Sequence, residues 1–86
     1  MEVSVYDTYV AKDNGTLMHF DILVEESVSS LDVYKYGKEY LESKKVLNTA
    51  LTTKECRFCH IENAPKEVEN TINKNGFYII EMENCN

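Results

Sequence analysis

Two β-rich segments joined by an Asn-Gly pair constrain the first third of the chain. Residues 3–11 read VSVYDTYVA, residues 17–24 read LMHFDILV, and the loop between them contains Asn14-Gly15. This pair between two β-rich runs is the strongest short signal for a β-hairpin, because both central residues of a tight turn need positive φ. We therefore predict an antiparallel hairpin.

The second segment of this hairpin predicts a sheet with two unlike faces. One alternating set of side chains is apolar, namely Met18, Phe20, Ile22 and Val24. The other set is mixed, namely Leu17, His19, Asp21 and Leu23. Depending on the register, Asp7 or Tyr9 of the first strand lies opposite this mixed set. If both helices pack on the apolar side, the mixed face stays uncovered and is a candidate homodimer interface.

Capping signals predict two helices. Ser29 or Ser30 is suited to cap a helix that fades near residues 44–45, and Gly37 on its apolar face would permit close packing on the sheet. A second helix begins at Pro65 and stops at Gly76, ahead of a strand over residues 77–82.

Residues 55–62, ECRFCHIE, allow two interpretations. Cys, Phe, His and Ile favour a strand, whereas Thr52 and Glu55 form a capping-box pattern that would begin a helix. We favour the strand. The element order is then ββαβαβ, which predicts one α+β domain over residues 1–86. We expect a two-layer sandwich, in which both helices cover one face of a four-stranded sheet with antiparallel pairs.

Composition limits the cellular compartments and the binding partners that are plausible for this chain. The net charge is −6 and the basic residues are dispersed, which disfavours nucleic acid as a partner. The first residues lack the pattern of a signal peptide, and no apolar run is long enough to span a membrane. Three cysteines cannot all pair within one chain. We therefore expect a cytoplasmic protein, without a membrane partner, whose cysteines are thiols or ligands.

The segment Cys56-Arg-Phe-Cys59-His60 matches three kinds of site as a bare pattern. Covalent haem attachment is disfavoured, because it normally occurs outside the cytoplasm and this chain has little room for a porphyrin. A redox dithiol usually lies at the start of a helix that follows a strand.

Zinc would use Cys56, Cys59, His60 and Cys85. On an extended strand, however, Cys56 and Cys59 lie roughly 10 Å apart on opposite faces. Partly buried strand residues are the simplest interpretation.

A second candidate polar site comprises Asp7, His19, Asp21 and Glu62. An Asp–His pair can act as a general base, but such a pair on a half-exposed sheet is more often a structural hydrogen bond. No adjacent nucleophile is evident from the sequence, so no catalytic residue is assigned.

Four motifs, VYDTYV, MHFDILV, ECRFCHIE and GFYIIEMENC, together resemble a family of short bacterial proteins classed as a domain of unknown function. The resemblance extends over nearly the whole chain. It implies a cytosolic α+β domain and carries no activity.

Three hypotheses of function follow. The first is a non-enzymatic accessory or ligand-binding module without a cofactor, which binds a protein or a small molecule. The second is a zinc-binding or thiol redox-sensing protein that uses the cysteine segment and Cys85. The third is a hydrolase-like enzyme around Asp7, His19 and Asp21, which is supported only by the types of these residues.

Overall fold

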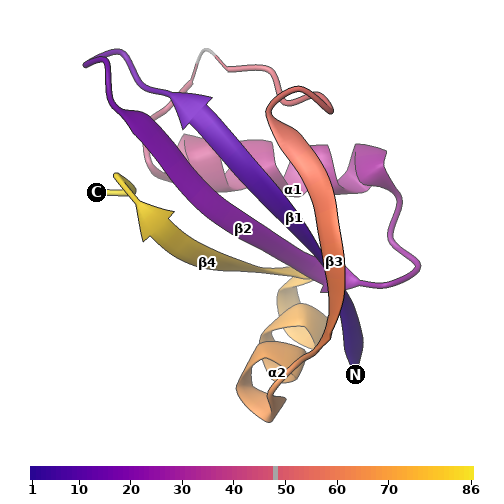
Figure 1. Ribbon diagram of the computed structural model, residues 1–86. Helices are drawn as coiled ribbons and strands as arrows, with labels where there is room; N and C mark the ends of the chain where they lie inside the picture. Colours follow the sequence, from indigo (N-terminus) through magenta and orange to yellow (C-terminus); the bar gives the residue numbers. More distant parts are fainter. Residues whose placement is uncertain (48) are drawn as a thin grey trace.

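Over residues 1–47 and 49–86, the computed structural model shows one four-stranded antiparallel sheet and two helices (Figure 1). The strands are β1 (Glu2–Ala11), β2 (Leu17–Glu25), β3 (Cys56–Asn63) and β4 (Phe77–Glu83), and the helices are α1 (Ser30–Ser43) and α2 (Lys66–Asn75). The strands lie in the spatial order β3-β1-β2-β4. The predicted α+β fold class and the order ββαβαβ are confirmed.

The central hairpin pairs β1 with β2 as predicted, but its turn is wider than the expected tight turn. Ala11 pairs with Leu17, so residues 12–16 form the loop. Gly15 has a φ of 86°, whereas Asn14 does not adopt positive φ. Instead, the Asn14 side chain accepts a hydrogen bond of 3.0 Å from the backbone N–H of Thr16. Only the glycine therefore needs the left-handed conformation in this loop.

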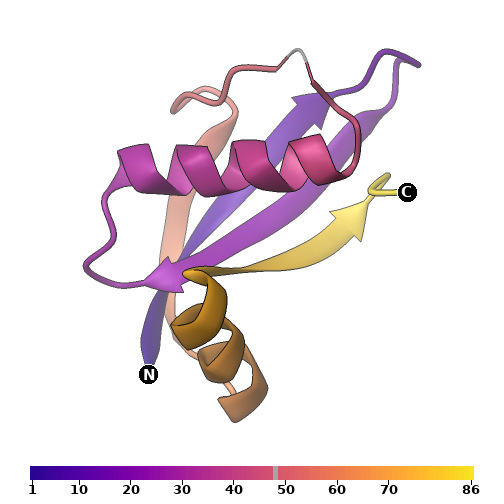
Figure 2. The same cartoon turned by 180° about the vertical axis from the view of Figure 1, so that it is seen from behind.

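Helix α1 packs on the apolar face of the hairpin, as Figure 2 shows. Ser29 caps the helix, because its Oγ accepts a bond of 3.3 Å from the backbone N–H of Asp32. The helix buries Val33, Gly37 and Leu41. These residues lie over the apolar set of β2, namely Met18, Phe20, Ile22 and Val24.

Helix α2 does not join α1 on that face, so the expectation that both helices cover one face is wrong. Its buried residues, Val68 and Ile72, pack with Val3, Val5 and Leu23, which alternate with the residues beneath α1. The helix connects β3 and β4, the two edge strands, and lies at one end of the sheet (Figure 2). The physical reason is that the mixed face is apolar at this end and offers a place to bury an amphipathic helix.

Residues 56–63 are extended, which confirms the predicted strand. The capping-box pattern before it forms an isolated turn. The Glu55 carboxylate accepts bonds from the backbone N–H and the Oγ1 of Thr52, at 2.9 and 2.8 Å, and the Cys56 N–H donates to the Thr52 carbonyl at 2.9 Å. The chain then continues as β3, because strand pairing with β1 outweighs the local helix signal.

No helix in the described ranges combines the length and the apolar character needed to cross a membrane.

The close approach of α1 to the sheet at Gly37 gives a first prediction. A Cβ atom at this position would lie 2.9 Å from Cδ1 of Ile22 and would also collide with Leu51. Gly37→Val should therefore lower the free energy of unfolding by about 2–3 kcal/mol in denaturant titrations, because the core must shift. The exposed neighbour provides a matched control: Lys38→Val should cost less than about 1 kcal/mol. Equal losses in the two variants would contradict close packing at Gly37.

Candidate functional site

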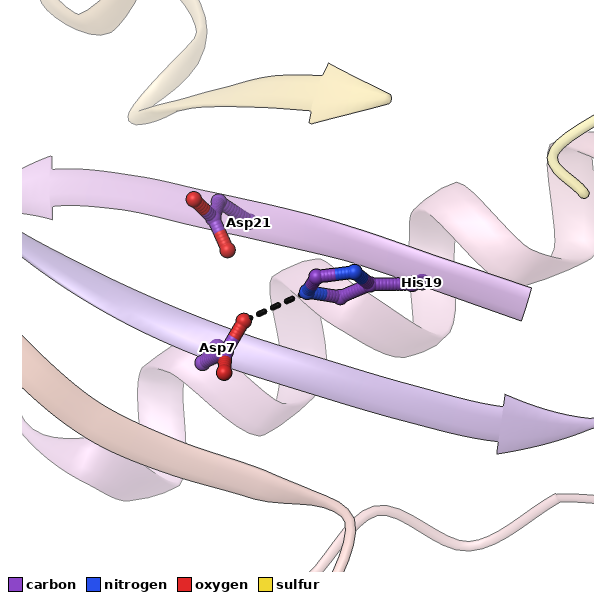
Figure 3. Close-up of side chains that lie close together, drawn as sticks. All are labelled: Asp7, His19 and Asp21. Carbon is purple, nitrogen blue, oxygen red and sulfur yellow. Dashed lines mark hydrogen bonds and ion pairs between the residues drawn. The ribbon is translucent and has the colours of Figure 1, made fainter. Parts of the chain in front are cut away.

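Asp7, His19 and Asp21 converge on the mixed face of the β1–β2 hairpin (Figure 3). The register pairs Asp7 with Asp21 directly, and it places His19 one pleat further along the same face. His19 Nε2 and Asp7 Oδ1 lie 2.6 Å apart and form a hydrogen bond. One ligand atom from each of the three residues lies within 4.8 Å of the others. Three of the four polar site residues expected from the sequence therefore meet at one point.

Tyr9 holds the imidazole of His19 in place. The two residues are cross-strand partners, and their rings stack at a centroid separation of 4.1 Å with an interplanar angle of 10°. The hydrogen bond to Asp7 fixes the edge of the same ring. Contact on a face and on an edge gives the His19 ring a defined orientation.

Asp21 is the unusual member of the cluster. Its side chain is buried, with the residue 9% exposed, and in the described part of the chain its Oδ1 has no hydrogen-bond partner. Burial, followed by the Asp7 carboxyl directly opposite, raises the pKa of Asp21 to about 6. Two carboxylates in register repel each other across a strand pair. Either a proton or a cation between the two carboxylates relieves this repulsion. The imidazole of His19 completes a donor set that suits a metal ion.

Glu62, the fourth predicted member, lies outside this cluster. It follows His60 on β3, and its Oε1 forms a 2.8 Å hydrogen bond with His60 Nε2. His60 pairs with Val5 and therefore lies on the same face as the cluster. The His60–Glu62 pair neighbours the cluster from the next strand.

The cysteine set expected for zinc does not come together among the described residues. Cys56 is buried beneath α1, whereas Cys59 on the same strand is exposed. Cys85 is buried near β2, where its Sγ lies 3.2 Å from the carbonyl oxygen of His19. Burial also raises the pKa of the Cys56 thiol, which disfavours its thiolate. Cys56 and Cys59 are separated because residues three apart on an extended strand point to different faces.

Arg57 lies beside the cluster without neutralising it. It pairs with Asp7 across β1 and β3, but its Nε donates to the Thr53 carbonyl at 3.2 Å. No ion pair between Arg57 and Asp7 exists in the described structure. Neither this arrangement nor the stack of Tyr9 on His19 was predicted. The stack follows from the hairpin register, and the position of Arg57 follows from the pairing of β3 with β1. The alternation of residues fixed neither register.

The family model "Domain of unknown function (DUF2024)" matches residues 1–82. The chain belongs to this family. It is also similar to protein NE1680 from Nitrosomonas europaea, whose NMR structure was solved as a structural genomics target. The two chains are 41% identical, each is covered over 100% of its length, and the TM-score is 0.87. No curated protein matches the chain. The resemblance to a family of unknown function is thus confirmed.

The buried carboxyl of Asp21 predicts a stability that depends on pH. Its raised pKa means that the fold favours the protonated acid, so this stabilisation is present below pH 4 and is lost as the pH rises through about 6. Asp21→Asn, which stays neutral, should therefore be more stable than the wild type at pH 7.5, by on the order of 1–2 kcal/mol. Denaturant titrations in EDTA at several pH values measure the difference.

Asp13→Asn is the matched control for this prediction, because Asp13 is exposed in the hairpin loop. Its stability relative to the wild type should not vary with pH. If the difference in free energy of unfolding between Asp21→Asn and the wild type stays constant from pH 4 to pH 7.5, the fold does not favour the protonated form of Asp21.

The unequal burial of the cysteines predicts one reactive thiol. Cys59 is exposed, whereas Cys56 and Cys85 are buried. A chromogenic disulfide reagent should modify one thiol of the native protein quickly, and the other two only on unfolding. Cys59→Ser should abolish the fast phase. A fast phase that survives in this variant would contradict the burial of Cys56 or Cys85.

Proposed function

We propose that this protein is a small cytoplasmic binding module whose ligand is one divalent metal ion, held by Asp7, His19 and Asp21. The observation that carries this proposal is the buried Oδ1 of Asp21, which lies beside a second carboxylate and lacks a hydrogen-bond partner among the described residues. A buried acceptor without a partner is costly. A cation between the carboxylates would satisfy Asp21 and remove the repulsion from Asp7.

The donor chemistry favours a transition ion such as Zn²⁺. Two carboxylates and one imidazole are ligands that Zn²⁺ accepts, and a three-ligand site leaves a position open for water or a further ligand. Tyr9 fixes the ring of His19 by stacking, so the imidazole is ordered before a metal arrives. Zinc, which the cysteine segment suggested, is thereby proposed at a different set of residues.

Two earlier expectations stay predictions beside this proposal. The cytoplasmic location is supported by three cysteines that are all free thiols. A homodimer through the mixed face is supported by the exposed side chains around the cluster, Tyr9, Leu17 and Ile80. We propose no reaction, since the described hydrogen bond of the His19 imidazole leads to Asp7 and not to a nucleophile.

Metal titration tests the proposal. Protein stripped with EDTA should bind one Zn²⁺ per chain in isothermal titration calorimetry at pH 7.5. Asp21→Asn should weaken this binding by about tenfold or more, because a ligand is lost. Zinc should also raise the melting temperature of the wild type, since an ion that binds only the folded state stabilises it.

Asp13→Asn serves again as the control and should bind zinc like the wild type. Failure of the wild type to bind zinc would reject the metal site and leave a carboxyl pair that shares a proton. Equal affinity in the wild type and in Asp21→Asn would place any bound ion elsewhere.

A further inference from the structure

The irregularity in β3 decides which face of the sheet receives His60. Tyr6 pairs with Phe58, but the preceding residue of β1, Val5, pairs with His60. Cys59 is therefore the extra residue of a β-bulge. Without the bulge, Cys59 would lie opposite Val5, and His60 would lie opposite Ser4 on the face that α1 covers. The bulge instead turns His60 to the open face.

On this face His60 is a diagonal neighbour of the cluster. Its cross-strand partner, Val5, lies two residues from Asp7, and β3 runs beside β1 (Figure 1). Diagonal positions are roughly 7–8 Å apart between Cα atoms, a separation that long side chains can bridge.

The surroundings of His60 resemble those of a metal-binding histidine. Its Nε2 is 2.8 Å from the carboxylate of Glu62, and a carboxylate on one ring nitrogen commonly orients a histidine that binds metal through the other. The side chain is 45% exposed, so the ring has room to turn. The ring of His60 must rotate to reach the ion, because His60 is not among the described residues whose ligand atoms already lie within 4.8 Å of one another, which are Asp7, His19 and Asp21.

We infer that His60 is the fourth protein ligand of this site and closes over a bound transition ion. The inference rests on the proposed metal-binding function and deepens it. Four protein ligands, two imidazoles and two carboxylates, match the tetrahedral coordination of Zn²⁺. Mg²⁺ prefers oxygen ligands in an octahedron and retains several waters. The site should therefore select Zn²⁺ over Mg²⁺, and His60 should carry much of that selectivity.

Titrations of Zn²⁺ and Mg²⁺ into His60→Gln test this inference. The variant should bind Zn²⁺ about tenfold or more weakly than the wild type, while any weak Mg²⁺ binding should change little. Cys59→Ser is the matched control, because it alters the adjacent bulge residue and should leave the zinc affinity unchanged. Circular dichroism and the melting temperature without metal verify that both variants are folded.

Nitrogen-15 spectra of the imidazole rings give a second readout. The chain contains two histidines, so His19→Gln and His60→Gln assign the signals. Zinc should shift the ring nitrogens of both histidines in the wild type. If zinc binds and shifts His19 alone, and His60→Gln binds as tightly as the wild type, this inference is overturned while the three-ligand site stands. If the wild type binds no zinc, both proposals fall.

Discussion

The antiparallel pairing of β1 with β2 is the interaction on which the rest of the structure depends. Its register separates two sets of side chains, and the apolar set forms the floor beneath α1. The same register puts Asp7 opposite Asp21 and Tyr9 opposite His19. A slip by one residue would exchange the two faces of the slipped strand, so the core and the cluster are specified together. A mutation that shifted this register would disturb both.

The cluster departs from what stability alone would select. A chain of 86 residues has a core of modest size, in which each buried apolar position matters. Yet Asp21 occupies a buried position in a central strand and faces a second carboxylate. Places where a sequence breaks a local rule are expected to be functional or strained sites. Strand β3, which pairs with β1, places His60 on the same face only because a bulge interrupts that pairing.

The sequence predicts the elements well and their arrangement in part. Three signals depend only on neighbouring residues, namely the apolar alternation in β2, the N-cap at Ser29 and the glycine that ends α2 at Gly76. The structure confirms each of them. The side of the sheet chosen by α2 was not predicted, because it depends on which end of the mixed face is apolar. The bulge at Cys59 was not predicted either, since no glycine or other local signal marks it. The candidate residues Asp7, His19 and Asp21 were identified by type, whereas their convergence followed only from the register.

The strand order has a consequence for how the protein is made. Both edges of the sheet come from the second half of the chain, since β3 flanks β1 and β4 flanks β2. During synthesis the hairpin leaves the ribosome first, with unpaired backbone groups on both sides. Such edges can pair with other chains until they are covered. The last residues close the structure: Lys12, beside the hairpin loop, donates to the backbone carbonyls of Asn84 and Asn86 at 2.9 and 3.2 Å. Loss of the C-terminal strand would therefore leave one side of β2 open to aggregation.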